Sequence, residues 1–437
     1  MSDFPTWAAT DKGEERSRRT DVSDLENMLQ AELELGSLLY RSGATGGRIS
    51  DSIRVLNQAL GGDRVCVDLG VETLRITVEK AGERREDTIE HDPPRSLNAM
   101  VLSEASHFLR HLPDDITSSQ VRSAIAALDR PRPRPGLREF TAMMAFMIIF
   151  GYLGHADLWS LPIIAIAVLA ALLAREALTK AGFGYFIPIL GGTVASTLVA
   201  ALLTLLLPTH TALIAMVVPC IILMPGFQLI NGGWEIFRHH LQTGIPRIVA
   251  WLSVLSVLTL GLLMVLLFYA PAQETVNYGL SLLDKLVLFT ILGGVISFCF
   301  CVMVGAPRQA LVLCILCGAI ARLIRTAIVE TGGDVALGTF AAALALSIVA
   351  VAFCAKRAPE VPVVLPLVAA SIQFIPSYYA ILSLQGMSQI IHLGASVPFP
   401  ILATTIYNGL LAVFIVAAIV FGTVLPLLAV DRHKKWY

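Results

Sequence analysis

The sequence predicts a polytopic α-helical membrane protein, with about ten transmembrane helices in two inverted five-helix repeats and an N-terminal cytoplasmic α+β domain. The first observation behind this prediction is the distribution of charge. Residues 1–139 hold 19 of the 32 Lys and Arg residues and 24 of the 33 Asp and Glu residues. The remaining residues are mostly apolar, so the chain changes near residue 139 from a part suited to water to a part suited to lipid.

The water-suited part divides into three segments. Residues 1–20 are polar, charged and aperiodic, which predicts a disordered N-terminus. Residues 21–129 show helical periodicity at both ends and three β-branched, alternating runs between them, which predicts an α+β domain with a small antiparallel sheet. The proline-rich run at 130–137 predicts a stiff basic linker, because proline cannot continue a helix.

The second observation is a series of apolar stretches in the rest of the chain. A hydrocarbon core about 30 Å thick needs about 20 apolar residues per helix. The fourth and ninth stretches are interrupted by prolines. The ten candidates are 138–154, 158–175, 184–207, 211–229, 246–269, 281–303, 309–329, 335–354, 361–383 and 398–428. We assign residues 138–270 to the first repeat, 281–430 to the second and 431–437 to a cytoplasmic tail.

The third observation is the charge of the loops between these stretches. Loops on the predicted inside contain Lys or Arg, whereas the predicted outer loops HAD, PTHT, PAQETVN and LQGMSQIIHLGAS contain neither. Cytoplasmic loops of membrane proteins carry an excess of Lys and Arg. With no signal peptide evident, both termini are expected in the cytoplasm and the helices in a bacterial inner membrane. Arg322 and Arg325 depart from the pattern, and we expect them to snorkel to the interface.

The repeat is predicted from a common offset between landmarks of the two halves. Because five is an odd number, a second set of five helices must enter from the opposite side, as in the inverted repeats of secondary transporters. Such repeats place broken helices around a site near the membrane midplane, here 219–233 and 366–379. The alternative is that Pro and Gly only kink packed helices. Landmarks separated by 150 or 151 residues are Pro208 and Pro359, Pro225 and Pro376, Gly244 and Gly394, and Arg175 and Arg325.

The richest polar run of the apolar part is 225–247. Pro225 and Gly226 are expected to break the helix and to free backbone groups. Glu235 is the candidate for proton coupling, because a carboxyl group drawn into a low-dielectric site can bind and release a proton. The alternative is that Glu235 forms a surface ion pair with Arg238 and contributes little.

Substrate contacts are expected from amide and hydroxyl side chains near the two breaks, the second of which is at Pro376. These groups can hydrogen-bond the carboxylate or hydroxyl of an amino acid. The alternative for them is ordinary hydrogen bonding or aromatic packing between helices. Arg247 and Arg308 are candidates for a charged gate on the predicted cytoplasmic side. The candidate substrate-binding residues are Gln228, Asn231, Gln373, Tyr378 and Asn408.

Other classes of function find no support in the motifs. The sequence contains no Walker A motif, nucleophile elbow, H-E-x-x-H or haem-attachment motif, so we expect no enzyme, no cofactor and an ion gradient as any energy source. Cys314 and Cys317 form a C-x-x-C within a spanning stretch, where two packed small residues are expected rather than a metal site. The net charge of −1 gives no reason to expect a nucleic-acid partner.

Several segments together resemble a known family. They are LLYRSGATGGRISDSIRVLNQALG, LMPGFQLINGGWEIFRHHLQTGIPR and AKRAPEVPVVLPLVAASIQFIPSYYAI, in this order. Their order and spacing resemble the bacterial threonine/serine exporter family, in which a soluble N-terminal region and a ten-helix membrane region form one chain. The sequence departs from the family pattern after Pro376, where Ser377 replaces the usual Gly, and at Glu235, where Asp is frequent.

The resemblance implies a secondary active exporter of L-threonine and L-serine, driven by the proton motive force. The residues alone predict only a transporter with inverted repeats. Two alternatives stay open, namely export of another small polar metabolite such as an organic acid, and a membrane sensor that acts through its soluble domain. The expected partners are a small amino acid, protons and the lipid bilayer, and self-association into a homo-oligomer is left open.

Overall fold

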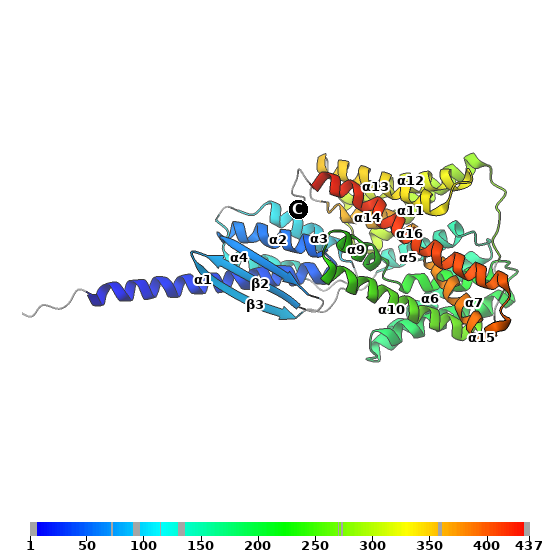
Figure 1. The fold of residues 1–437 in the computed structure, drawn as a ribbon, viewed down its shortest axis with the longest axis horizontal. Coiled ribbons are helices and arrows are strands. Elements are labelled where there is room, and N and C mark those ends of the chain that lie inside the picture. The colour runs from blue at the N-terminus through cyan, green and yellow to red at the C-terminus, as the bar shows by residue number, and fades with distance from the viewer. Residues whose placement is uncertain are drawn as a thin grey trace, which may run out of the picture. The chain divides into compact units, whose positions relative to one another are not determined.

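The computed structural model describes residues 7–70, 73–90, 97–113, 115–129, 136–269, 271, 274–356 and 361–431. The chain divides into two compact units (Figure 1). One is built mainly from Met1–Arg132 together with His239–Thr243, and the other from Pro133–Arg238 together with Gly244–Trp436. The N-terminal unit and the membrane unit therefore correspond closely to the two parts that the charge distribution separates.

The N-terminal unit has the predicted order of two helices, three strands and two helices. Its strands form the predicted antiparallel sheet, in the order β1-β2-β3, with Val67 opposite Ile76 and Ile76 opposite Asp87. The elements are α1 (Trp7–Arg41), α2 (Gly46–Ala59), β1 (Arg64–Leu69), β2 (Thr73–Lys80), β3 (Glu83–Glu90), α3 (Ala99–Arg110) and α4 (Ser118–Leu128).

The core of this unit lies between the sheet and helix α1. Leu74, Ile76 and Val78 alternate along β2 and are fully buried, whereas the residues between them are more exposed. This period of two places one face of the sheet against the helices, because successive strand side chains point to opposite faces. Helix α1 packs against β2, β3 and α4. The Thr117 side chain accepts a hydrogen bond from the backbone of Gln120 and begins α4 with a capping box.

The N-terminus differs from the disordered segment expected at residues 1–20. The backbone of α1 is helical from Trp7, because the Glu- and Arg-rich stretch after Pro5 contains good helix formers and continues into the packed part of the same helix. Residues 1–6, most of the predicted linker and the basic tail after residue 431 lie outside the described residues.

All the regular secondary structure of the membrane unit is helical within the residues that the structure describes. Seven of its helices are long and apolar enough to cross a membrane, or nine if each of two bent pairs counts as one span. The predicted total of ten would need the 17-residue α5 as well, and it stays a prediction. The elements are α5 (Leu137–Leu153), α6 (Ser160–Lys180), α7 (Phe186–Leu206), α8 (Ala212–Val217), η1 (Val218–Leu223), α9 (Gly226–Phe237), α10 (Leu241–Leu266), α11 (Leu282–Met303), α12 (Arg308–Glu330), α13 (Val335–Lys356), α14 (Val364–Ser371), η2 (Ile372–Phe374), α15 (Ser377–Leu393), η3 (Gly394–Ser396) and α16 (Phe399–Asp431).

Two spans are broken at prolines. The α8–η1 segment meets α9 at a bend of 63°, and the α14–η2 segment meets α15 at a bend of 44°. Pro225 and Pro376 are the residues just before α9 and α15. A proline there removes a backbone N–H that would have continued the preceding helix, so the chain turns before the next helix begins.

The two halves of the membrane unit share one order of elements. Three long helices are followed by a short helix with a 3₁₀ turn and then by two further helices, in α5–α10 and again in α11–α16. Equivalent helices also pack alike, since α6 packs on α7 as α12 packs on α13. Helix α5 packs against α11 and so joins the halves.

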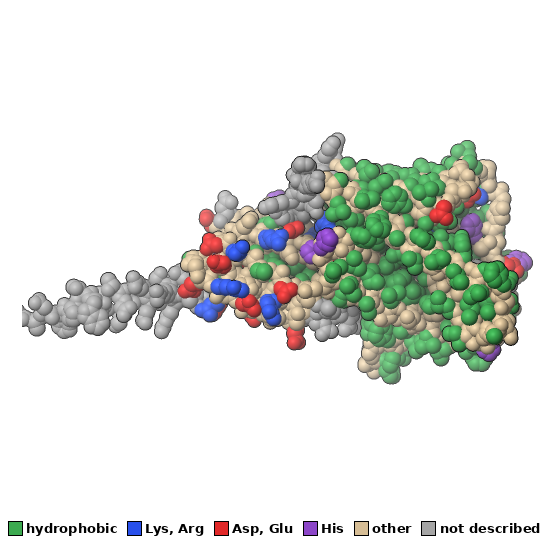
Figure 2. Space-filling model, in the orientation of Figure 1, with side chains coloured by type: hydrophobic (Ala, Val, Ile, Leu, Met, Phe, Trp, Pro, Cys, Tyr) green, Lys and Arg blue, Asp and Glu red, His purple; other side chains and the backbone are tan. Residues whose placement is uncertain are grey.

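The surfaces of the two units differ in kind. In Figure 2, Lys, Arg, Asp and Glu side chains gather on the N-terminal unit, whereas hydrophobic side chains cover the visible face of the membrane unit. Among the exposed side chains of the membrane helices are Leu205, Leu260 and Phe414. Apolar groups exposed over whole helices suit contact with lipid, where every backbone polar group is already paired within its helix.

A buried carboxyl group lies inside the N-terminal unit. Glu32 of α1 has no exposed surface, and its Oε1 accepts a hydrogen bond of 2.9 Å from the Asn57 amide of α2. Its Oε2 has no hydrogen-bond partner in the part of the chain that the structure describes. Burial raises the pKa of Glu32 to about 8, although the hydrogen bond from Asn57 lowers the pKa. The side chain therefore carries a proton at neutral pH.

The stability of the N-terminal unit should fall as pH rises from about 4.5 to about 8. In this window the folded state holds the Glu32 proton and the unfolded state does not, since the ordinary pKa is 4.5. The expected slope is about 1.4 kcal/mol per pH unit. This slope can be measured by hydrogen exchange of the α1 amides in the full chain, after correction for the intrinsic exchange rates. Glu32→Gln should remove this slope and exposed Glu104→Gln should keep it, and equal slopes in both variants would contradict the assignment.

Candidate functional site

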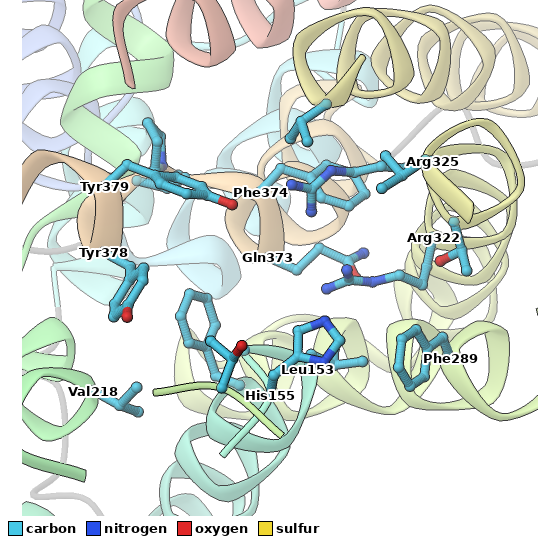
Figure 3. Close-up of a pocket in the computed structure, with 18 of the residues that line it drawn as sticks. Leu153, His155, Val218, Phe289, Arg322, Arg325, Gln373, Phe374, Tyr378 and Tyr379 are labelled. Atoms are coloured by element: carbon cyan, nitrogen blue, oxygen red, sulfur yellow. The ribbon is translucent and has the colours of Figure 1, made fainter. Parts of the chain in front are cut away.

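The membrane unit contains a cavity of about 310 Å³ that both halves line (Figure 3). This volume lies at the lower end of the range for small-molecule sites. The first half contributes the end of α5, the loop after it and α8–η1. The second half contributes α11, α12, the start of α13 and the break between η2 and α15. The polar lining residues are His155, Thr275, Arg322, Arg325, Thr326, Glu330, Gln373, Tyr378 and Tyr379.

Two arginines of α12 give the cavity its charge. Arg322 and Arg325 are three residues apart and therefore lie on the same helix face. Their guanidinium carbons lie 5.2 and 5.0 Å from the centre of the Phe374 ring. Figure 3 shows both side chains reaching from α12 into the cavity. Within the described residues neither arginine forms an ion pair, and Arg325 Nε has no hydrogen-bond partner.

Buried charges of this kind are costly in an apolar environment. A charged side chain inside a membrane protein normally faces a partner or a water-filled pathway, because removing it from water without compensation costs several kcal/mol. Arg322 is only 6% exposed. Stacking on an aromatic ring offsets part of this cost. The site is therefore electropositive, and its natural complement is a carboxylate or another anion.

The orientation of Arg322 is set by Gln373. The Gln373 amide nitrogen donates to Gly318 O at 3.2 Å and to Ala370 O at 3.0 Å. With its nitrogen engaged on two carbonyls, the amide presents Oε1 to Arg322, whose Nε donates to it at 3.0 Å. The 3₁₀ turn η2 that precedes Pro376 thus holds the acceptor that fixes the guanidinium.

The backbone position of Arg322 is set by a close crossing of α11 and α12. A Cβ added at Gly293 would lie 2.4 Å from Arg322 Cβ and 2.9 Å from Gly318 O. Ser297, one turn further along α11, donates to Ala369 O at 3.0 Å. Small residues at such crossings let backbones approach closely. The crossing therefore decides how far the guanidinium reaches into the cavity.

The segment that links the two halves closes one wall of the cavity. Val276 N donates to His155 O at 3.1 Å, and His155 Nδ1 lies 3.2 Å from Val276 O. The Tyr278 hydroxyl lies 2.8 Å from Tyr152 O and 2.7 Å from Ala156 O, and its ring stacks on Tyr152 at 4.5 Å. Because the segment is tied to the loop after α5, His155 is held at the cavity wall.

A second charged pair lies in the first half, outside the cavity. Glu235 of α9 and Arg247 of α10 are both almost fully buried, and Glu235 Oε2 lies 3.2 Å from Arg247 Nε. Two glycines let these helices meet, since a Cβ at Gly232 would lie 3.0 Å from Gly244 O. Arg238, the partner predicted for Glu235, lies over the Trp234 ring. The pair therefore fastens the helix after the first break to its neighbour.

The structure brings together only part of the predicted site. Gln373, Pro376 and Tyr378 line the cavity, as expected for a site at the second break. Arg308 is exposed at the start of α12. The other predicted residues are not among those lining the cavity. They are Pro225 and Gly226 at the first break and the buried side chains of Gln228, Asn231, Glu235, Arg247 and Asn408.

Sequence reasoning missed the two arginines and His155 as cavity residues. Arg322 is buried rather than directed to the membrane surface, so the expectation that it snorkels is wrong. The signal was present, since Arg322 and Arg325 were the charges that violated the loop pattern. Polar residues inside a membrane segment mark a pathway or site more often than a surface position.

Two family models and two known transporter subunits are similar to parts of this chain. A family model described as "Putative threonine/serine exporter" matches residues 30–269, and one described as "Threonine/Serine exporter, ThrE" matches residues 290–429. "Probable succinate transporter subunit YjjP" of Escherichia coli (strain K12) is 28% identical over 237 residues, which cover 52% of this chain and 88% of that protein. The protein of the same name from Klebsiella aerogenes is 25% identical over 253 residues, covering 56% and 93%. No solved structure matches.

No metal centre accompanies the cavity in the described part of the chain, where no group of three His, Cys, Asp or Glu side chains is arranged to hold an ion. Cys314 and Cys317 are both buried in α12.

Gly293→Ala should disturb the cavity more than Gly294→Ala. The added methyl group would press on Arg322 and on the backbone of α12 at Gly293, whereas at Gly294 its nearest contact is 3.2 Å from an Ile315 side chain. Overpacking of this kind costs about 1–3 kcal/mol. Thermal unfolding of the purified protein and substrate counterflow in proteoliposomes measure the two effects. Equal counterflow in both variants would show that the crossing does not position Arg322.

Proposed function

Because the chain belongs to the threonine/serine exporter family, we propose that it is a secondary active exporter of small carboxylate-bearing metabolites in the bacterial inner membrane. The family and the apolar helices make it a multi-pass membrane transporter. The observation that carries the proposal is the cavity between the halves, where Arg322 and Arg325 face a space of small-metabolite size. Two cations with no acidic partner among the described residues suit a ligand that brings the negative charge itself.

One candidate substrate class is L-threonine and L-serine, the cargo in the family's description. In this case the α-carboxylate would bind Arg322 and Arg325, and the side-chain hydroxyl would lie near Tyr378 or Tyr379. The ammonium group would then enter a positively charged space. Glu330 also lines the cavity, but its Oε2 is 2.6 Å from Lys285 Nζ, so this carboxylate is already neutralised.

A dicarboxylate is the second candidate, and the geometry favours it. Two guanidinium groups can each pair with one carboxylate of a four-carbon diacid, which leaves no buried charge uncompensated. Two relatives at 28% and 25% identity are named as subunits of a probable succinate transporter. An amino acid with one carboxylate would leave the cavity with a net positive charge.

The proposed transport cycle uses the two halves as moving parts. The repeated order of elements and the breaks at Pro225 and Pro376 support inverted repeats that rock around a central site. His155, Thr275 and Val335 line the cavity and belong to loops or helix ends predicted to face outward. We therefore propose that this conformation is open toward the outside, with both termini in the cytoplasm.

The proton motive force can drive export of an anion through its electrical component. Moving one elementary charge across 100 mV is worth about 2.3 kcal/mol. An interior that is negative favours the outward movement of any substrate that leaves with net negative charge. For an electrically neutral amino acid, by contrast, exchange with an incoming proton would have to supply the energy.

In the proposed transporter the two halves of one polypeptide form the substrate cavity together. The relatives named as subunits align with about half of this chain, whereas this chain supplies both walls of the cavity. Self-association into a homo-oligomer stays open as a proposal. The N-terminal unit has its own core, and a sensor role for it is the remaining alternative.

Arg325→Gln should lower succinate counterflow in proteoliposomes by about tenfold or more. Losing a hydrogen bond between charged groups costs about 1.5–3 kcal/mol, and each 1.4 kcal/mol is a factor of ten. Arg322→Gln should act in the same direction. The control is Arg138→Gln, which removes an exposed arginine at the start of α5.

The substrate panel separates the candidates. Succinate and threonine are compared in the same vesicles at equal concentration. Stronger counterflow with succinate, lost in both cavity variants, supports the dicarboxylate. If threonine counterflow is stronger than succinate counterflow and falls as much in Arg325→Gln, the substrates are hydroxylated amino acids. Vesicles that move neither solute would refute the proposed function.

The coupling role of Glu235 stays a prediction with its own test. Removing either member of a buried ion pair costs about 3–5 kcal/mol, so Glu235→Gln and Arg247→Gln should lower protein abundance alike. If Glu235 exchanges a coupling proton, Glu235→Gln slows export per molecule more than Arg247→Gln does. If both variants export at the same rate per molecule, Glu235 has no coupling role, and the ion pair only holds α9 against α10.

A further inference from the structure

His155 is held in an unusual backbone conformation at the cavity wall. Its φ of 65° is uncommon for non-glycine residues, although His, Asn and Asp adopt such values more often than the others. Two contacts with Val276 maintain it, one through the backbone and one through Nδ1. Figure 3 shows the imidazole projecting into the same space as Arg322 and Gln373. The ring is therefore fixed in a position from which it can act on the contents of the cavity.

The contact with Val276 also determines which ring nitrogen can exchange a proton. A carbonyl oxygen only accepts hydrogen bonds, so the Nδ1 that lies 3.2 Å from Val276 O must carry a hydrogen. Nε2 then has the free lone pair of the neutral ring. Within the residues that the structure describes, Nε2 forms no hydrogen bond. Imidazole is the side chain best suited to gain and lose a proton near neutral pH.

Charged and titratable groups lie around the ring. Arg322 and Arg325 line the same cavity as cations, and the negative charge of Glu330 is taken up by Lys285. Asp157 accepts hydrogen bonds from the backbone N–H groups of Ser160 and His210. The Tyr278 ring stacks on the rings of His155 and Tyr152, and burial raises the pKa of Tyr278. Tyr378 and Tyr379 also line the cavity.

A bound dicarboxylate supplies two negative charges beside the ring, and these favour a proton there. The affinity for the anion and the affinity for the proton then increase each other by the same factor. Glu235 does not line the cavity, so a proton bound there has no such direct link to the substrate.

We infer that His155 is the proton-exchanging group of the cavity, which binds one proton at Nε2 when a carboxylate substrate enters and releases it when the substrate leaves. The inference rests on the proposed function and adds the residue that links proton and substrate. Water supplies the proton on one side and receives it on the other. A dicarboxylate with two negative charges then leaves with one proton and one net negative charge.

His155→Asn isolates the titrating nitrogen. Asn tolerates a positive φ and its amide can still donate to Val276 O, so the wall keeps its shape while Nε2 is lost. His392→Asn is the matched control, because it makes the same substitution at an exposed histidine of α15 that is not among the residues lining the cavity. Proteoliposomes with a trapped pH dye and radiolabelled succinate give the number of protons moved per succinate.

The expected ratio is about one proton per succinate for the wild type and for His392→Asn, and close to zero for the succinate flux that remains in His155→Asn. A proton ratio in His155→Asn equal to that of the wild type would overturn the inference.

A second measurement decides the inference even if no transport is found. Nitrogen chemical shifts of the histidine rings in the purified protein, with the His155 signals assigned by their loss in His155→Asn, report the tautomer and protonation state. Added succinate should drive protonation of Nε2 at fixed pH. Nε2 that does not respond to succinate would refute the role of His155, whereas the absence of flux in wild-type vesicles would refute the proposed function itself.

Discussion

Two guanidinium groups inside an apolar helix bundle are the constraint on which the membrane unit depends. Neighbouring elements hold Arg322 and Arg325 there, beside a cavity that we propose admits an anion. The 3₁₀ turn that ends in the second break supplies the Gln373 acceptor and the Phe374 ring. The glycine crossing of α11 and α12 fixes the backbone from which the arginines project. Helix breaks and small residues thus serve one electrostatic arrangement.

In the proposed mechanism the same arrangement connects substrate with proton. The positively charged cavity would attract a carboxylate, and a bound carboxylate would favour a proton on His155, so that each ligand increases the affinity for the other. The linking segment between the halves fixes His155 beside this charge through its contacts with Val276 and Tyr278. Because this wall comes from the first half and the arginines from the second, movement between the halves would separate the proton site from the anion site.

Local signals in the sequence predicted much of the fold. Alternation along β2, the charge boundary near residue 139 and the prolines at 225 and 376 each act through neighbouring residues, and the sheet and the two bent spans follow from them. The helix from Trp7 was not predicted, because a charged stretch without apolar periodicity resembles disorder. The cavity depends on a crossing between α11 and α12 and on the turn that contains Gln373, 51 residues after Arg322. Those contacts bring Gln373 to Arg322, whereas Gln228 and Asn231 are not among the residues lining the cavity. Spacing along the chain does not reveal this difference.

The central claim is that Arg322 and Arg325 together form a binding site for two carboxylates. Calorimetric titration of the purified protein with succinate and with threonine, at the same pH and salt concentration, tests it most directly. The account predicts that succinate binds more tightly than threonine, and that Arg322→Gln combined with Arg325→Gln abolishes succinate binding while the protein stays folded. Succinate binding that survives the double substitution, or threonine binding that is tighter than succinate binding, would contradict it.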